Sequence, residues 1–464
     1  MGILATLLSM SHLGKTVGIM ITASHNPEKD NGMKLVEPNG EMLQASWEST
    51  ANLLANSDSL NSTILEIINE KAINTSIKAR VALGYDTRSS STRLAACCLD
   101  GLAMATVFNF KLVTTPQLHY FVFKLNDSSV SDDSVNEQMY FDQLASAYTV
   151  LNKASTEITV DCANGVGAMK MKKLASMLNI KFNLVNTGDG ELNKGCGADY
   201  VKIQQQAPAN CVPVEGMKYA SLDGDADRIV YFYFNQGKFK LLDGDKIALL
   251  FVEYLKEIAP NANIGVVQTA YANGNSTAEL KKLAKVVITQ TGVKHLHHAA
   301  LAFDIGVYFE ANGHGTVVFD PNYLKTANEK VLAFSRLINP LVGDAIADLL
   351  AVETVLHHFN LSAKDWDAKY FDLPNKQVKV VVKDRSMFKC TNADQQLLEP
   401  VFMQPLIDNE VAKYKFGRCF VRPSGTEDIV RVYAEAETVE ETNKLAKSVA
   451  MLVYEKCDGL ELPV

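Results

Sequence analysis

The chain has 464 residues, and its 45 Lys and Arg against 53 Asp and Glu give a formal net charge of −8 at pH 7. Binding to a phosphate backbone needs a concentrated basic surface, and the chain has no such segment, so the sequence excludes a nucleic-acid-binding protein. No apolar run is long enough to span a membrane. A hydrophobic share of 47% is typical of a soluble globular protein, and the length predicts roughly three domains.

The start of the chain and its cysteines bear on where the protein resides. Residues 1–6 (MGILAT) fit the pattern for N-terminal myristoylation, but we interpret residues 2–13 as a helix that Gly14 ends. Eight cysteines occur without a C-x-x-C pair, which indicates reduced thiols in a cytoplasmic protein.

Short apolar runs rich in β-branched residues alternate with amphipathic stretches along most of the chain. The runs lie at 17–22, 81–84, 158–162, 219–222, 229–234, 264–269 and 286–289. The amphipathic stretches lie at 168–177, 246–258 and 276–283. This alternation predicts βαβ units and therefore an α/β fold with mixed, largely parallel sheets.

Polar segments and turn signals divide the chain into four parts. Residues 126–137 predict an exposed loop, and Asn235-Gln236-Gly237 predicts the turn of a hairpin over 231–240. The last part pairs three strands with a long helix, and these lie at 377–382, 418–422, 429–435 and 440–456. We predict domains at 1–153, 154–241, 242–365 and 366–464.

A serine-containing loop, residues 22–27 (TASHNP), directly follows the first predicted strand. Pro27 keeps Asn26 out of the helical region, so we expect Ser24 in an extended loop at the carboxyl end of a strand. Ligands bind at this edge of α/β sheets. The alternative is an ordinary Ser/Thr turn. The segment lacks a G-x-S-x-G elbow, so it does not indicate a hydrolase.

Three carboxylates, Asp223, Asp225 and Asp227, stand at alternate positions of the segment SLDGDADR. On an extended chain they would project to one side, with Gly224 letting the backbone bend. Their mutual repulsion predicts a bound cation, and oxygen ligands favour Mg²⁺. The alternative is a solvated acidic turn. A second acidic pair, at 243 and 245, precedes an apolar helical pattern and indicates a helix N-cap instead.

Three further segments are candidates for ligand binding. Residues 422–426 (RPSGT), with Arg431, predict a phosphate cradle, or else a tight turn. Residues 309–316 combine a carboxylate, an amide and an imidazole that suit recognition of sugar hydroxyls, or else form a polar hairpin turn. Residues 291–298 contain three histidines without zinc-ligand spacing, which favours a loop that contacts phosphate or sugar through Lys294.

Taken in this order, the segments at 22–27, 223–228, 310–314 and 422–426 resemble the phosphoserine, magnesium, sugar and phosphate loops of the α-D-phosphohexomutase superfamily. The resemblance extends over essentially the whole chain. It implies three similar mixed-sheet α/β domains and a smaller C-terminal α+β domain around a central cleft.

The resemblance also implies a role for each matching residue. Ser24 is expected to be phosphorylated and, through its phosphate, to bind one Mg²⁺ together with Asp223, Asp225 and Asp227. The residues expected to contact the sugar are Glu310, Ala311 and Asn312. Those expected to bind the non-reacting phosphate are Arg422, Pro423, Ser424, Gly425, Thr426 and Arg431. Candidates for moving the hydroxyl proton or contacting phosphate are His25, Lys34, Arg228, Lys294 and His314.

The sugar loop departs from the common pattern of the superfamily. It reads Glu310-Ala311-Asn312-Gly313-His314 where Gly-Glu-x-Ser-Gly-His is common. Together with residues 267–274 and 291–298, this variant resembles the eukaryotic branch that acts on N-acetylglucosamine phosphates. That implies interconversion of the 6-phosphate and the 1-phosphate, through a 1,6-bisphosphate, on the route to UDP-N-acetylglucosamine. The alternatives are another phosphohexomutase or a non-catalytic relative that binds sugar phosphate. The oligomeric state stays open.

The chain also departs from the superfamily before Ser24. Members normally begin with a further strand that contains a Gly-Thr-Ala/Gly-Phe-Arg motif, and this motif is absent here. We therefore expect a shortened product whose first domain has an unpaired sheet edge and a weakened core.

Overall fold

The computed structural model describes residues 1–152, 156–178, 180–424 and 428–463. Within it the chain forms two compact units. The first comprises Met1–Ile247 and Asn312–Trp366, and the second comprises Ala248–Ala311 and Asp367–Val464. Both units combine helices with sheets, so the predicted α/β fold is confirmed.

The first sheet of the first unit has the strand order β2-β1-β3-β4. Strands β1, β3 and β4 are parallel, and β2 runs antiparallel to β1. Their bounds are β1 (Thr16–Ile21), β2 (Met33–Val36), β3 (Ala79–Tyr85) and β4 (Ala105–Leu112). The helices of this part are α1 (Gly2–Ser11), α2 (Ala45–Ala55), α3 (Leu60–Glu70), α4 (Ser91–Asp100), α5 (Thr115–Leu125) and α6 (Glu137–Leu151).

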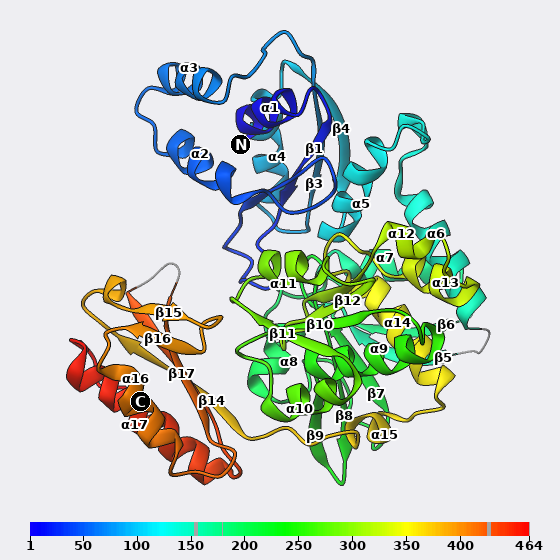
Figure 1. Ribbon diagram of the computed structural model, residues 1–464. Helices are drawn as coiled ribbons and strands as arrows, with labels where there is room; N and C mark the ends of the chain where they lie inside the picture. The colour runs from blue at the N-terminus through cyan, green and yellow to red at the C-terminus, as the bar shows by residue number, and fades with distance from the viewer. Residues whose placement is uncertain (153–155, 179, 425–427, 464) are drawn as a thin grey trace. The chain divides into compact units, whose positions relative to one another are not determined.

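Helix α1 packs on this sheet as part of one hydrophobic core (Figure 1). Leu4 and Leu8, four residues apart, are fully buried with Val17 of β1. The helix ends at Ser11, and Gly14, whose φ is +80°, donates its N–H to the carbonyl of Ser9 at 2.9 Å. Glycine accepts this left-handed conformation without steric cost, as the sequence predicted.

The segment 126–137 is less exposed than predicted. Asn126 accepts a hydrogen bond from the Thr16 N–H and donates one to the Thr16 carbonyl, both at 2.8 Å. A short 3₁₀ helix, Asp132–Ser134, follows, and Val135 is buried. The hydrogen bonds of Asn126 therefore fix the start of this segment to the start of β1. Composition alone does not reveal this contact.

The second sheet of the first unit has the order β6-β5-β7-β8-β9. Its strands are β5 (Thr156–Asp161), β6 (Ile180–Val185), β7 (Lys218–Leu222), β8 (Ile229–Asn235) and β9 (Lys238–Leu242), with helices α7 (Gly167–Ala175) and α8 (Ala198–Gln204). The predicted hairpin is confirmed: Asn235 pairs with Lys238, and the two turn residues, Gln236 and Gly237, have φ of +53° and +68°. Positive φ at both positions is the favoured geometry of a two-residue hairpin turn.

Helix α9 (Gly244–Ile258) follows this hairpin. The chain returns to the first unit at Asn312. The elements that follow are β13 (Gly315–Phe319), α12 (Pro321–Leu324), α13 (Glu329–Leu337), α14 (Ala345–His358) and α15 (Ala363–Asp367). Helix α14 is almost wholly buried, and two buried carboxylates lie one turn apart at its start, Asp344 at the N-cap and Asp348 within the helix. Asp344 caps the helix, accepting from the Ala347 N–H at 3.2 Å and from the Tyr140 hydroxyl at 2.8 Å. The two carboxylate oxygens of Asp348 accept no hydrogen bond from any described residue.

Replacement of Asp348 by Asn is expected to stabilise the protein at neutral pH. Burial, and then the neighbouring Asp344, raise the pKa of Asp348 well above its usual value. A raised pKa in the folded state means that stability is complete below the ordinary Asp pKa and is lost as the pH rises toward the folded-state pKa. We therefore expect Asp348→Asn to gain about 1–3 kcal/mol of unfolding free energy near neutral pH and almost nothing near pH 4.

Urea denaturation at the two pH values measures this difference. Asp344→Asn is the control, because the Asp344 carboxylate accepts hydrogen bonds from the Tyr140 hydroxyl and the Ala347 N–H. Its replacement should therefore destabilise the protein. An equal gain at both pH values for Asp348→Asn would contradict the explanation.

The second unit contains three parallel strands and a separate antiparallel sheet. The parallel strands are β10 (Ile264–Thr269), β11 (Lys285–Thr289) and β12 (Ile305–Phe309), with helices α10 (Gly274–Leu283) and α11 (Val293–Ala300). The antiparallel sheet has the order β14-β18-β17, with bounds Asn375–Val381, Ile429–Glu435 and Arg418–Pro423. Helix α17 (Val439–Lys456) lies along this sheet (Figure 1) and buries Leu445, Val449 and Val453 at four-residue spacing.

The sequence analysis missed three elements of this C-terminal part. These are β15 (Lys389–Thr391), β16 (Gln396–Glu399) and α16 (Met403–Val411). The two strands have only three and four residues, which is too short for an alternating pattern to stand out. No described helix is long and apolar enough to cross a membrane.

Candidate active site

Ser24 lies at the carboxyl end of β1, as predicted, but its loop is not extended. The Asn26 N–H donates to the Ala23 carbonyl at 3.0 Å, and Ser24 itself has a φ of +50°. The Thr22 hydroxyl oxygen accepts the Ser24 N–H at 3.0 Å. This local hydrogen bond bends the chain ahead of Pro27, so the expectation of an extended loop is wrong.

The three aspartates lie in the turn between β7 and β8, so the expectation of an extended chain is wrong here too. The Ala226 N–H donates to the Asp223 carbonyl at 3.1 Å, and the left-handed residue is Ala226, with φ +58°. Gly224 serves a different purpose from the predicted bend. A Cβ at this position would lie 2.8 Å from the Ser24 carbonyl oxygen, so only glycine permits the two loops to approach.

The approach of the two loops brings the serine and the aspartates together. The Ser24 hydroxyl donates to Asp223 Oδ2 at 2.6 Å and lies 3.1 Å from Asp227 Oδ1. All three carboxylates are buried, and one oxygen of each lies within 4.8 Å of the others. Asp225 Oδ2 accepts from the Thr115 hydroxyl at 2.6 Å, whereas its buried Oδ1 has no hydrogen-bond partner among the described residues. This oxygen-only set of buried donors fits a hard divalent cation such as Mg²⁺.

The carboxylates perturb one another and their neighbours. Burial, and then Asp227 and Asp225, raise the pKa of Asp223 well above its usual value. Burial opposes ionisation of Asp227, but His314 and Lys34 hold the pKa of Asp227 well below its usual range. The Lys34 ammonium lies 3.7 Å from Asp225 Oδ2 and 3.6 Å from Asp227 Oδ2. Burial also opposes the charge of Lys34, but Asp225 and Asp227 raise the pKa of this ammonium.

The other candidates for proton transfer differ in position. His314 Nδ1 lies 3.5 Å from Asp227 Oδ1, and Arg228 Nε lies 3.8 Å from the same oxygen. Burial, and then Arg228, lower the pKa of His25. Lys294 belongs to the second unit. The first unit therefore places His314, Lys34 and Arg228 directly beside the carboxylates.

The predicted sugar loop is divided between the two units. Glu310 and Ala311 end one segment of the second unit, whereas Asn312 and His314 belong to the first. Asn312 Oδ1 accepts the His314 N–H at 3.0 Å, which orients the backbone next to Asp227. The expected grouping of all four residues at one ligand stays a prediction.

The expected loop conformation of residues 291–298 is wrong, because Val293–Ala300 forms helix α11, whereas the contact of Lys294 with a ligand stays a prediction. Leu296 and Ala300 are both buried at four-residue spacing, and this apolar stripe favours the helix. His297 is buried, with Nδ1 3.1 Å from the Tyr308 hydroxyl. The only candidate metal cluster among the described residues is the aspartate triad, so the histidines do not indicate a zinc site.

The predicted phosphate cradle lies at the end of β17. Arg422 pairs in register with Arg431 of β18, so the two guanidinium groups leave the same face of the sheet. Arg422 Nε lies 3.7 Å from Asp394 Oδ2, and Ser424 is buried. Gly425 and Thr426 lie outside the described residues. Paired arginines at a strand end suit binding of a phosphate group.

Comparisons with known proteins agree with this geometry. Two family models, for domains II and III of phosphoacetylglucosamine mutase AMG1, match residues 136–230 and 243–361. Models for domain I and the C-terminal domain of phosphoglucomutase/phosphomannomutase match 4–62 with 54–133, and 377–452. The phosphoacetylglucosamine mutase of Candida albicans is 49% identical over 97% of this chain and 92% of its own length. That of Homo sapiens is 43% identical over 99% and 91%.

The chain belongs to the phosphoacetylglucosamine mutase family. A solved structure of N-acetylglucosamine-phosphate mutase in its substrate complex has a TM-score of 0.92, at 48% identity over 97% of this chain and 92% of that one. The Aspergillus fumigatus N-acetylphosphoglucosamine mutase in complex with GlcNAc-6P and magnesium has a TM-score of 0.93, at 44% identity over 98% and 91%. The resemblance to the phosphohexomutase superfamily is thereby confirmed.

In this member of the phosphoacetylglucosamine mutase family, the sequence did not predict the contacts of two threonines with the triad. Thr115 begins α5, and its hydroxyl donates to Asp225. The Thr22 hydroxyl lies 2.8 Å from Asp86 Oδ2 and 3.1 Å from Asp225 Oδ2. Thr115 stands far from Asp225 in sequence, but its position after a strand and before Pro116 marks a helix start at the ligand-binding edge.

The second acidic pair has the structural role that the sequence predicted. Asp243 immediately precedes α9, and its Oδ1 accepts the Asp245 N–H at 3.1 Å. Its other oxygen forms an ion pair with Lys202. Asp243 therefore stabilises the helix start and is separate from the triad.

Proposed function

We propose that this member of the phosphoacetylglucosamine mutase family interconverts N-acetylglucosamine 6-phosphate and N-acetylglucosamine 1-phosphate. The observation that supports the proposal most is the buried Ser24 hydroxyl, 2.6 Å from Asp223 Oδ2 within a triad of carboxylates. A binding module has no need of a phosphorylatable serine at such a site. The product lies on the route to UDP-N-acetylglucosamine, which we propose to operate in the cytoplasm.

In the proposed reaction, Ser24 alternately donates and accepts a phosphoryl group. The phosphate ester of Ser24 breaks as its phosphoryl group moves to the free hydroxyl of the sugar monophosphate, which forms the 1,6-bisphosphate and releases the proton of that hydroxyl. After the bisphosphate has turned round, its other phosphoryl group moves to Ser24 Oγ. We assign the proton transfer to His314, because its Nδ1 faces Asp227 and its buried Nε2 has no hydrogen bond to a described residue.

The metal ligands of this proposal are Asp223, Asp225 and Asp227, with the phosphate on Ser24, for one Mg²⁺ per chain. When bound, Mg²⁺ offsets the negative charge of the phosphoryl group during transfer. Lys34, beside Asp225 and Asp227, adds a fixed positive charge at the same place. Support comes from the donor chemistry and from the magnesium complex of the Aspergillus fumigatus relative.

The predicted sugar and phosphate loops are proposed to hold the rest of the substrate. Glu310, Ala311 and Asn312 would contact the sugar. Arg422, Pro423, Ser424, Gly425, Thr426 and Arg431 would bind the phosphate that is not reacting. The registered pairing of Arg422 with Arg431 supports the phosphate site, and one cradle can serve the two orientations of the bisphosphate in turn.

The test is conversion of N-acetylglucosamine 6-phosphate to the 1-phosphate by the purified full chain, with Mg²⁺ and a trace of the 1,6-bisphosphate. Glucose 6-phosphate is the parallel substrate. We expect the N-acetylated sugar to react at least about tenfold faster, measured as kcat/KM. Faster reaction of glucose 6-phosphate would indicate another phosphohexomutase. A folded chain that converts neither would indicate a non-catalytic relative.

A further inference from the structure

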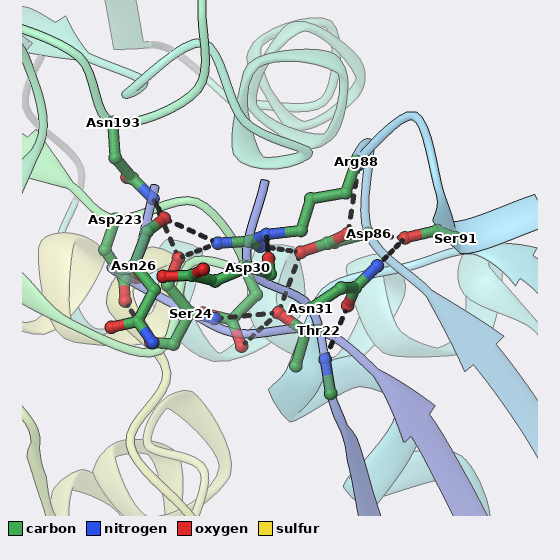
Figure 2. Close-up of polar contacts among 12 residues, drawn as sticks. Thr22, Ser24, Asn26, Asp30, Asn31, Asp86, Arg88, Ser91, Asn193 and Asp223 are labelled. Carbon is green, nitrogen blue, oxygen red and sulfur yellow. Dashed lines mark hydrogen bonds and ion pairs between the residues drawn. The ribbon is translucent and has the colours of Figure 1, made fainter. Parts of the chain in front are cut away.

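A buried arginine holds the backbone of the serine loop (Figure 2). Arg88 follows β3, and its side chain is 0% exposed. Its Nη2 donates to the Ser24 carbonyl at 3.1 Å and to the Asn26 carbonyl at 2.7 Å. Its Nε donates to the Asp30 carbonyl at 2.8 Å. One guanidinium group thus gathers three carbonyl oxygens of the loop that contains the nucleophile.

The charge of this arginine is already balanced. Its Nη1 forms an ion pair with Asp86, which is equally buried. Asp86 also accepts hydrogen bonds from the hydroxyls of Thr22 at 2.8 Å and Ser91 at 2.9 Å (Figure 2). Because the ion pair of Arg88 with Asp86 has no net charge, Arg88 changes the electrostatic field at the aspartate triad little. Its contribution is to hold the serine loop in position.

A second side chain supports the same carbonyl from a loop that follows a strand of the other sheet of the unit. Asn193, between β6 and α8, donates from Nδ2 to the Ser24 carbonyl at 2.8 Å and to the Asn26 carbonyl at 3.0 Å. Figure 2 shows Arg88 and Asn193 both reaching the serine loop. With Thr22 accepting the Ser24 N–H, both backbone polar groups of Ser24 are bound.

Ser24 needs this support, because its φ of +50° is a conformation that residues other than glycine rarely adopt. We propose that Arg88 is a positioning residue for phosphoryl transfer, and that Asn193 is its second support. The inference rests on the proposed function. Every contact that Arg88 and Asn193 make with the serine loop is with a backbone carbonyl, and none is with Ser24 Oγ. The contacts are therefore compatible with both the hydroxyl and the phosphate ester, and they hold Ser24 in place through both transfers.

The decisive variant is Arg88→Lys, which keeps the positive charge but cannot direct donors to three carbonyls and Asp86 at once. We expect kcat to fall about 10²-fold, as for a misplacement of reacting groups by about 1 Å. We expect KM and the Mg²⁺ concentration for half-maximal rate to change by less than about threefold, because the residues proposed to bind sugar, phosphate and metal are intact. Because a smaller folded fraction alone would also lower the apparent kcat at unchanged KM, kcat is calculated per folded protein, with the folded fraction of each variant measured by circular dichroism.

Arg80→Lys is the matched control. Arg80 is the second residue of β3, at the opposite end of the same strand, and also binds a hydroxyl, a carbonyl and a carboxylate, those of Thr16, Leu125 and Asp132. It should leave kcat within about threefold of the wild type. An equal loss of kcat in both variants would overturn the proposal, as would an unchanged kcat in Arg88→Lys.

Asn193→Ala keeps the test decisive if Arg88→Lys does not fold, because Asn193 is partly exposed. We expect its kcat to fall about tenfold with KM retained, and an unchanged kcat in this variant would then overturn the proposal. A wild-type chain without mutase activity would instead reject the proposed function, so the two failures are distinguishable.

Discussion

Ser24→Ala is expected to reduce mutase activity by at least about 10⁴-fold, because the group that accepts and returns the phosphoryl group is lost. No neighbouring hydroxyl can replace it. The Thr22 hydroxyl is held between Asp86 and Asp225, and the Thr115 hydroxyl donates to Asp225. The measurement is the initial rate of formation of N-acetylglucosamine 1-phosphate, with the binding of the 1,6-bisphosphate measured separately by calorimetry.

Binding of the bisphosphate should survive the Ser24→Ala substitution, because the proposed sugar and phosphate contacts are unchanged. The matched control is Ser9→Ala, which removes another buried hydroxyl from the first unit. Ser9 donates to the Lys15 carbonyl at 2.8 Å and accepts the Arg80 N–H at 2.9 Å, so its loss should lower Tm and leave kcat unchanged. A Ser24→Ala variant with more than about one hundredth of the wild-type rate would show that Ser24 is not the essential acceptor.

Asp225→Asn is expected to have opposite effects on activity and on the stability of the metal-free protein. Loss of one anionic ligand should raise the Mg²⁺ concentration for half-maximal rate at least about tenfold and lower kcat/KM at least about 10²-fold. The same change removes one of three buried charges that repel one another, so Tm measured in EDTA should rise. Activity titrations with Mg²⁺ and thermal denaturation in EDTA measure the two effects.

Asp243→Asn is the control for this experiment, because Asp243 also belongs to an Asp-Gly-Asp sequence in the first unit. It caps α9 and pairs with Lys202, so its replacement should cost about 1 kcal/mol of stability and leave the Mg²⁺ dependence unchanged. The metal assignment would be rejected if Asp225→Asn responded to Mg²⁺ like the wild type.

Local patterns in the sequence predicted most of the described strands but fewer than half of the described helices. The strands Ile264–Thr269 and Ile429–Glu435 have the predicted bounds, and α17 begins one residue before the predicted helix. Elements that bury one face, and strands that are buried on both faces, produce the apolar patterns on which these predictions rest. The helix at Val293–Ala300 was not predicted, because its three histidines are typical of a ligand-contacting segment, whereas buried Leu296 and Ala300 decide its structure.

The sequence by itself determined which chemical groups are available: a serine in a polar loop, three aspartates at alternate positions, and arginines at the end of a strand. Only the tertiary structure decided that the serine and the aspartates meet. The approach depends on Gly224 beside the Ser24 carbonyl and on Arg88 and Asn193, which hold that carbonyl from loops that follow strands of two different sheets. Local propensity does not report contacts between residues so far apart in the chain, and left-handed backbone at Ser24 and Ala226 is stabilised only by the packing around it.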